Sequence, residues 1–186
     1  MRAVKAGTQT LFIVNDDVEL AWAADADGAH VGQEDLPADS TRRLLGAGRI
    51  LGVSTHNLQQ AEAARAHGAD YLGFGPVFAT GTKDTGYAPR GLDAIREIRR
   101  AVALPILAIG GITLENVAEV IAAGATAPAV ISAVVRAADI TAALSIDGLQ
   151  GSTKPFDPRI HAARAFAGDG GVVVRRVRVQ PDLLAG

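Results

Sequence analysis

The feature that most constrains the fold of this chain is the alternation of short apolar runs with stretches of helical character. The apolar runs are predicted strands at residues 10–14, 28–32, 49–54, 71–74, 105–109 and 129–132. They are continuous, which is typical of parallel strands buried on both faces of a sheet. The predicted helices between them, at 18–24, 40–45, 58–67, 92–101 and 114–123, can make the crossovers that parallel strands need. The chain is therefore predicted to be an α/β protein.

Composition narrows the classes of function. The 186 residues, 48% hydrophobic and 20% charged, suffice for one globular domain with a core. A net charge of −2 offers no basic excess for nucleic acid or an anionic membrane, so we expect a small-molecule ligand. The absence of cysteine excludes disulfides, thiolate zinc sites and cysteine nucleophiles, and it fits the reducing cytoplasm, the expected location. No apolar run is long enough to predict a membrane span.

The chain is predicted to have two parts. Residues 1–150 carry the repeated units and form the domain. Residues 151–155, with the sequence GSTKP, are typical of a linker. The tail at 151–186 contains a basic run at 172–179 that could form one edge strand, but no strand–helix unit accompanies it. We expect this tail to be loosely ordered.

Two loops that follow predicted strands suit a substrate with more than one phosphate. Residues 75–83 offer the hydroxyls of Thr80 and Thr82 and the ammonium of Lys83, in a glycine-bearing stretch typical of a mobile flap. Residues 110–113 offer backbone N–H groups, including that of Gly111, ahead of a helix predicted to begin near residue 114. A solvated loop lysine and a plain tight turn are the alternative interpretations.

The end of the sixth predicted strand could add to the same anion site. Ile131 and Ser132 follow that strand and could supply further N–H donors. The alternative interpretation of Ser132 is an ordinary loop hydroxyl.

Two carboxylates are predicted at the ends of neighbouring strands. Asp16 follows the first strand and Asp35 the second. Since the carboxyl ends of parallel strands meet at one edge of a sheet, the pair could share one Mg²⁺, which prefers oxygen ligands and substrate phosphates. The alternative interpretation is a helix N-cap at Asp16 and a loop carboxylate at Asp35.

One of the two histidines near predicted strand ends, His56, is a candidate general base. His56 ends the third predicted strand, where a general base could lie, but no carboxylate is placed to orient it, so we interpret it as structural. His30 lies inside the second predicted strand and is interpreted as a packed histidine. The sequence shows no Ser-His-Asp order, no Walker loop and no dinucleotide fingerprint.

The order and spacing of six motifs resemble those of the thiamine phosphate synthase family. The motifs are IVND at 13–16, GAHVGQEDLP at 28–37, GVSTH at 52–56, GFGPVF at 73–78 with TGTK at 80–83, AIGGIT at 108–113 and VISA at 130–133. The resemblance covers residues 8–145. It implies a (β/α)₈ TIM barrel that joins hydroxymethylpyrimidine pyrophosphate to hydroxyethylthiazole phosphate, makes thiamine phosphate and releases pyrophosphate.

The resemblance also implies roles for the matching residues. Asp16 and Asp35 would hold Mg²⁺, and Asn15 and Lys83 would contact the pyrophosphate. Ser54 would lie beside the reacting pyrimidine, so that Lys83 and Ser54 are the expected catalytic residues. The expected ligands of the thiazole phosphate are Thr80, Thr82, Gly111, Ile131 and Ser132.

The chain departs from the family pattern at both ends and at one turn. Six strand–helix units are counted where the family has eight, and the first two, which carry basic pyrophosphate ligands, have no counterpart. The sequence GATAP stands at 124–128 where the family has a Gly-Ala-Asp-Gly turn, and the tail after Gly151 matches no family segment. We interpret the chain as a truncated member whose open sheet edges could be covered by self-association.

Three functions stay open from the sequence. The first is an active synthase. The second is an inactive fragment that retains thiazole phosphate binding. The third is a thiazole tautomerase, an isomerase without pyrophosphate chemistry. The presence of Asp16, Asp35 and the TGTK stretch at 80–83 favours the synthase.

Overall fold

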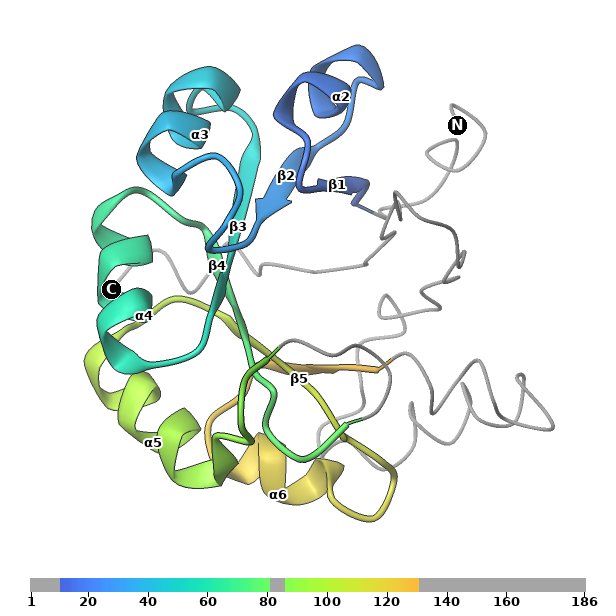
Figure 1. Cartoon of the computed structure of the whole chain (residues 1–186), viewed down its shortest axis with the longest axis vertical. Helices are drawn as coiled ribbons and strands as arrows, with labels where there is room; N and C mark the ends of the chain where they lie inside the picture. Colours follow the sequence, from blue (N-terminus) through green and yellow to red (C-terminus); the bar gives the residue numbers. More distant parts are fainter. Residues whose placement is uncertain (1–10, 81–85, 131–186) are drawn as a thin grey trace, which may run out of the picture.

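The computed structural model describes residues 11–80 and 86–130, which form a curled, six-stranded parallel sheet (Figure 1). The strands are hydrogen-bonded in the order of the sequence. They are β1 (Ile13–Asn15), β2 (Gly28–Val31), β3 (Ile50–Thr55), β4 (Tyr71–Phe74), β5 (Ile106–Ile109) and β6 (Ala127–Ala129). Sequential order with every pair parallel requires a crossover after each strand, and helices supply these crossovers.

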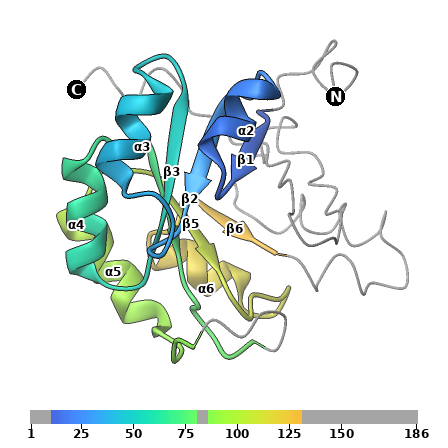
Figure 2. The same cartoon turned by 45° about the horizontal axis from the view of Figure 1, so that its top comes forward.

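The helices lie along the outer, convex side of the curled sheet, as two views show (Figures 1 and 2). They are α2 (Val18–Ala23), α3 (Ala38–Leu45), α4 (Leu58–Ala66), α5 (Gly91–Ala101) and α6 (Val117–Ala122). The predicted α/β class is confirmed, and the arrangement is that of part of a TIM-like barrel. No helix within the described ranges is long and apolar enough to cross a membrane.

Alternate residues of each strand face the helices and the concave side of the sheet. Val53 in β3 is in register with Leu72 in β4, and Leu72 with Ile106 in β5. All three are buried in the main apolar cluster together with residues of the helices, so they lie on the convex face. Their strand neighbours therefore face the concave side. The apolar core lies between the sheet and the helices. The concave face is not part of that core.

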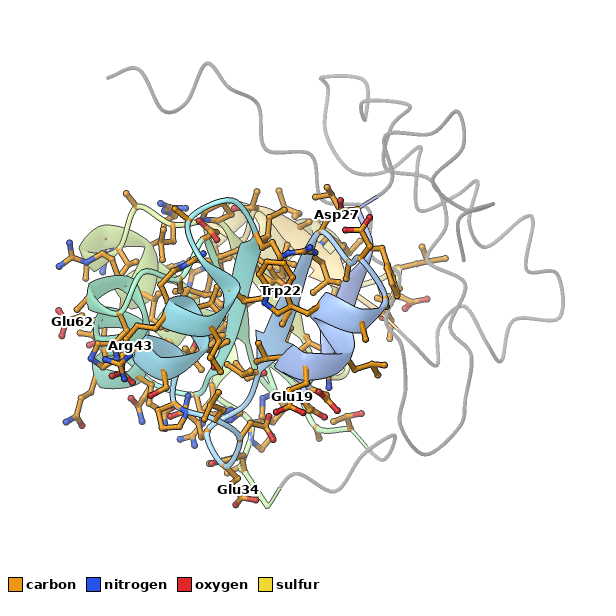
Figure 3. All side chains as sticks on the ribbon, turned by 90° about the horizontal axis from the view of Figure 1, so that it is seen from above. Glu19, Trp22, Asp27, Glu34, Arg43 and Glu62 are labelled. Atoms are coloured by element: carbon orange, nitrogen blue, oxygen red, sulfur yellow. The ribbon has the colours of Figure 1, made fainter. Side chains whose placement is uncertain are left out.

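Neighbouring helices are tied together at the surface. Trp22 on α2 is half exposed, and Figure 3 shows it between α2 and α3. Its indole N–H donates to the carbonyl of Leu44 on α3 over 3.0 Å. The Arg49 guanidinium lies 4.0 Å from the centroid of the indole ring, a cation–π contact. The exposed tryptophan is thus held by two specific contacts.

Most element boundaries agree with the sequence within one or two residues, but the region of α6 and β6 differs. The predicted helix at 114–123 begins only at Val117, because the Asn116 side chain bridges the preceding turn. The last predicted strand, at 129–132, is found at Ala127–Ala129, where Thr126 and Ile106 exchange hydrogen bonds that set the register. Pro128 therefore lies inside β6, the last strand of the described sheet, where its missing N–H is tolerated. The predicted division at residue 150 lies outside the described residues.

Candidate active site

Polar side chains gather at the carboxyl edge of the sheet, where each strand ends. Figure 3 shows Asp27, just before β2, and Glu34, beyond its end, at opposite ends of the sheet. Asn15, Ser54 and the loops after β4 and β5 belong to the Glu34 end, because all strands run in the same direction. Active sites of parallel α/β folds lie at this edge.

Three side chains from three adjacent strands form a hydrogen-bonded chain on the concave face. His30 in β2 lies between the other two, with Nδ1 2.9 Å from the Tyr71 hydroxyl and Nε2 2.8 Å from Oγ of Ser54. Tyr71 is 3% exposed, whereas His30 and Ser54 are only partly buried. The predicted packed histidine is therefore bonded to Ser54, one of the two residues expected to be catalytic.

Two glycines leave the space that these three hydrogen-bonded side chains occupy. His30, Gly52 and Tyr71 are in register across β2, β3 and β4. A Cβ at Gly52 would overlap both the Tyr71 ring and Nδ1 of His30. A Cβ at Gly73, which is in register with Ser54, would lie 2.9 Å from Cε1 of His30. The rings can meet across β3 only because these positions have no side chain.

The loops after β4 and β5 lie side by side. The N–H of Val77 donates to the carbonyl of Ile109 over 2.9 Å, and that of Phe78 to the carbonyl of Gly110 over 3.0 Å. Gly111 approaches so closely that a Cβ there would lie 2.5 Å from the Ala79 carbonyl oxygen. The two loops singled out in the sequence are therefore neighbours in the fold. This packing also brings Gly111 next to the segment that carries Thr80.

The glycine turn at 110–113 is not followed directly by a helix. The N–H of Thr113 donates to the Asn116 side chain over 2.9 Å, and the Asn116 amide donates to the Gly111 carbonyl over 3.0 Å. The expectation of free N–H groups is therefore wrong at Thr113. No hydrogen bond among residues 11–80 and 86–130 uses the N–H of Gly111 or Ile112. These two donors are the ones left in the turn for an anion.

The first candidate carboxylate, Asp16, directly follows β1. It has a left-handed backbone conformation with φ of 68°, and its Oδ1 accepts from Nδ2 of Asn15 over 2.6 Å. Its alternative role as a helix cap is wrong, because Asp17 caps α2 by accepting from the N–H of Leu20 over 2.8 Å. Asp16 thus follows the end of β1 but does not cap α2.

The second candidate carboxylate, Asp35, lies in the loop after β2. Its Oδ2 accepts from the N–H of Gly32 over 2.6 Å, which closes the loop and leaves Oδ1 without a hydrogen bond among the described residues. Asp16 and Asp35 follow paired strands, as predicted. The part of the chain that the structure describes holds no group of three or more His, Asp or Glu that could bind a metal by themselves. A metal between the two carboxylates would need further ligands such as substrate phosphate or water.

His56 supports the start of the loop after β4. Its Nδ1 donates to the carbonyl of Gly75 over 2.5 Å, which fixes the proton on that nitrogen, and its ring stacks on Tyr87 at 3.7 Å between centroids. Burial lowers the pKa of His56, opposed by the Gly75 carbonyl and assisted by the charge of Arg90. The ring joins the two ends of the 75–90 loop, which agrees with its interpretation as a structural histidine.

Of the remaining candidates, Thr82, Lys83, Ile131 and Ser132 lie outside the described residues. Tyr71 is a site residue that the sequence pattern does not identify, because it stands within an apolar predicted strand. The available signal was a tyrosine in β4 in register with Gly52 of the neighbouring strand β3, and this signal requires the strand register.

Two family models match the chain. One, described as thiamine monophosphate synthase, matches residues 1–134, which is well over half of the chain. The other, described as aromatic amino acid lyase, matches residues 109–178, less than half of the chain and largely outside the described residues. The first match contains all the candidate site residues.

Curated relatives agree with the first model. The chain is 58% identical over 131 residues to a thiamine-phosphate synthase of Chloroflexus aurantiacus, covering 70% of this chain and 60% of the relative. It is 55% identical over 132 residues to that of Moorella thermoacetica, covering 71% and 63%. The chain thus spans about three fifths of the length of these relatives.

A solved structure is similar in both sequence and fold. It is the thiamine phosphate pyrophosphorylase from Pyrococcus furiosus, with a TM-score of 0.64 and 41% identity, covering 72% of this chain and 63% of that one. The similarity therefore extends from the motifs to the arrangement of the strands and helices that carry them.

Proposed function

This chain belongs to the thiamine monophosphate synthase family, and we propose that it joins hydroxymethylpyrimidine pyrophosphate to hydroxyethylthiazole phosphate with release of pyrophosphate. The observation that carries the proposal is the contact between the loops after β4 and β5. It brings the Thr80 segment and Gly111 together at the carboxyl edge, as a site for the thiazole phosphate requires. The proposed complete fold is the (β/α)₈ barrel, of which the described sheet contributes six strands.

The donor set at the ends of β1 and β2 fits Mg²⁺. Both candidate ligands are carboxylates, and Oδ1 of Asp35 accepts no hydrogen bond among the described residues. Asp16 and Asp35 would hold the ion, which would supply charge stabilisation for the pyrophosphate leaving group. Asn15 donates to Asp16 and in this way orients that carboxylate.

The residues of the chain then have defined tasks. Thr80 and the N–H groups of Gly111 and Ile112 would bind the thiazole phosphate, with Thr82, Ile131 and Ser132 completing that site. This fixes the thiazole nitrogen relative to the pyrimidine methylene carbon. The carbon–oxygen bond to pyrophosphate breaks, the thiazole nitrogen donates its electron pair to the methylene carbon, and Lys83 with Asn15 stabilises the departing charge. Ser54 lies beside the pyrimidine, and no protein nucleophile is required.

The test is thiamine phosphate and pyrophosphate formation by the purified 186-residue chain with both substrates and Mg²⁺. We expect equal amounts of the two products, and a loss of activity on the order of 100-fold or more in Asp35→Asn. Asparagine keeps an oxygen that can accept from Gly32, so the loop should stay closed. The matched control is Asp39→Asn, which removes a carboxylate on α3 that pairs with Arg43 on the same helix, and it should retain activity.

Absence of both products from chain that melts cooperatively would contradict the proposal. Titration calorimetry with thiazole phosphate would then separate the remaining alternatives. Binding without turnover would favour a fragment that retains only the thiazole phosphate site.

A further inference from the structure

We propose that Tyr71 and His30 are positioning residues that direct the hydroxyl of Ser54 toward the bound substrate. The inference deepens the proposed function and rests on it where it refers to substrate. Its structural part concerns the direction of the two hydrogen bonds in the Tyr71–His30–Ser54 chain.

The hydrogen-bonded series Tyr71–His30–Ser54 runs from a buried residue to a partly exposed one. Tyr71 is 3% exposed and is in register with Gly52, two residues before Ser54 and so nearer the amino end of the sheet. His30 bridges the two, with bonds of 2.9 Å to Tyr71 and 2.8 Å to Ser54. Ser54 is only partly buried, and it lies where β3 approaches the loops. The buried phenol is therefore the anchor, and the serine is the end that a ligand can reach.

When the His30 imidazole is neutral, its two hydrogen bonds must run in the same direction along Tyr71–His30–Ser54. One ring nitrogen carries a proton and donates, and the other accepts. Either Tyr71 donates to Nδ1 and Nε2 donates to Ser54, or both bonds are reversed. A phenol is a far stronger acid than an aliphatic hydroxyl and thus the stronger donor. The first direction is favoured, and it places the histidine proton on Nε2.

This direction settles what Ser54 can offer. Its oxygen accepts from His30, so its own proton is available to donate elsewhere. The backbone carbonyl of Ser54 is already held by the Gln33 side chain over 2.6 Å, which steadies the end of β3. A pyrimidine ring nitrogen is an acceptor of the right kind for the free O–H. The reverse direction would use up the serine proton on His30 and leave only an acceptor.

The space around the hydrogen-bonded side chains depends on two glycines. Gly52 and Gly73 are the positions where any side chain would collide with the His30 or Tyr71 ring. Apolar side chains of ordinary size on these strands could have filled the same space, as they do on the convex face. The absence of side chains at Gly52 and Gly73 is therefore what allows the three polar groups to meet.

The first experiment reads the proton position without substrate. The full chain is labelled with ¹⁵N-histidine, and the imidazole nitrogen shifts are recorded at a pH where histidine is neutral. The His30 signals are identified by their loss in His30→Gln, or, should that variant not fold, by substituting the three other histidines in turn. We expect the proton on Nε2 in the wild type and a shift toward Nδ1 in Tyr71→Phe. A proton on Nδ1 in the wild type, or no change in Tyr71→Phe, would overturn the inference.

The second experiment tests whether Tyr71 acts through Ser54. In the synthase assay Tyr71→Phe should lower kcat about tenfold, as loss of one orienting hydrogen bond does, with a smaller change in KM. In a Ser54→Ala background the same substitution should change kcat less than about twofold, because the group it orients is gone. Equal losses in both backgrounds would refute positioning. Tyr87→Phe, which removes an exposed phenol but keeps its ring, is the control expected to retain activity.

The two experiments fail separately. If the wild type forms no product, the proposed function falls, while the nitrogen shifts still decide the direction of the hydrogen bonds. If the wild type is active and the shifts show the opposite tautomer, the function stands and the positioning role falls.

Discussion

Leu72 and Tyr71 are neighbours in β4 and both are buried, yet they lie on opposite faces of the sheet. Leu72 packs among the apolar side chains between sheet and helices. Tyr71 lies on the concave face, where its hydroxyl bonds to His30. The comparison teaches that burial alone does not tell a stabilising residue from a site residue. The face of the strand on which a residue lies makes this distinction. One face is covered by helices, and the other carries hydrogen-bonding groups that lie near the loops.

The largest expected effect is on the convex face. Leu72→Ala should lower the free energy of unfolding by about 2–5 kcal/mol, since a fully buried leucine leaves a cavity between Val53 and Ile106. Denaturant unfolding measures this change. The volume-conserving Leu72→Met should cost less than about 1.5 kcal/mol. In the fraction that stays folded, kcat should change little. A large drop in kcat with unchanged stability would break the division between the two faces.

A smaller loss of stability is expected on the concave face, with a larger loss of activity. Gly52→Ala inserts a methyl group into the space of the Tyr71 and His30 rings, and overpacking of this kind costs about 1–3 kcal/mol. The hydrogen-bonded chain must move, so kcat should fall at least about tenfold. The control is Gly48→Ala, where nothing lies within 4 Å of the new methyl group. If Gly52→Ala were as active as Gly48→Ala, the concave chain would have no part in the reaction.

The smallest expected effect is on the pH dependence of stability, through His56 beside the loop after β4. Burial lowers the pKa of His56 in the folded chain below its ordinary value of 6.5, and Arg90 acts in the same direction. The unfolded chain therefore binds more protons as the pH falls below about 6.5, and the free energy of unfolding should decrease there. Above that pH the contribution is fully present. The stabilising neutral ring is the one that donates to Gly75 and stacks on Tyr87.

The difference between wild type and His56→Gln isolates this contribution. Glutamine does not titrate, so the stability of the variant should fall less steeply below pH 6.5 than that of the wild type. Parallel curves for the two proteins over that range would show that His56 is not the group responsible. Denaturant midpoints measured at closely spaced pH values provide the comparison.

Local signals account for what the sequence predicted well. Strand β4 was predicted at 71–74 and is found at Tyr71–Phe74, and Gly68, with φ of 82°, follows the end of α4 as expected. The α/β class and the grouping of polar residues at strand ends follow from the same local pattern. The predicted boundaries were wrong where a side chain makes hydrogen bonds to the backbone. The Asn116 side chain bonds the turn before α6, so this helix begins later than predicted. Thr126 bonds to Ile106 just before β6, so this strand begins earlier than predicted. Such bonds depend on where the turn places its partners.

For the candidate site too, some residues could be predicted from local sequence signals and others could not. Ser54, Asp16 and Asp35 could be named because each stands after an apolar run in a motif of a known family. That Asp17 and not Asp16 caps α2 is a difference of one residue, and backbone geometry decides it. Tyr71 could not be found, because in the sequence it is one apolar residue in a buried strand.

The sequence by itself determined the class of fold, the family and the order of the candidate residues along the chain. Periodicity, turn residues and motif spacing are local properties, and a single chain displays them in full. Only the tertiary structure decided that His30 meets Tyr71 and Ser54, and that Gly111 packs beside Ala79. Those contacts join residues far apart in the chain, and they depend on strand register, which the packing of the whole sheet determines.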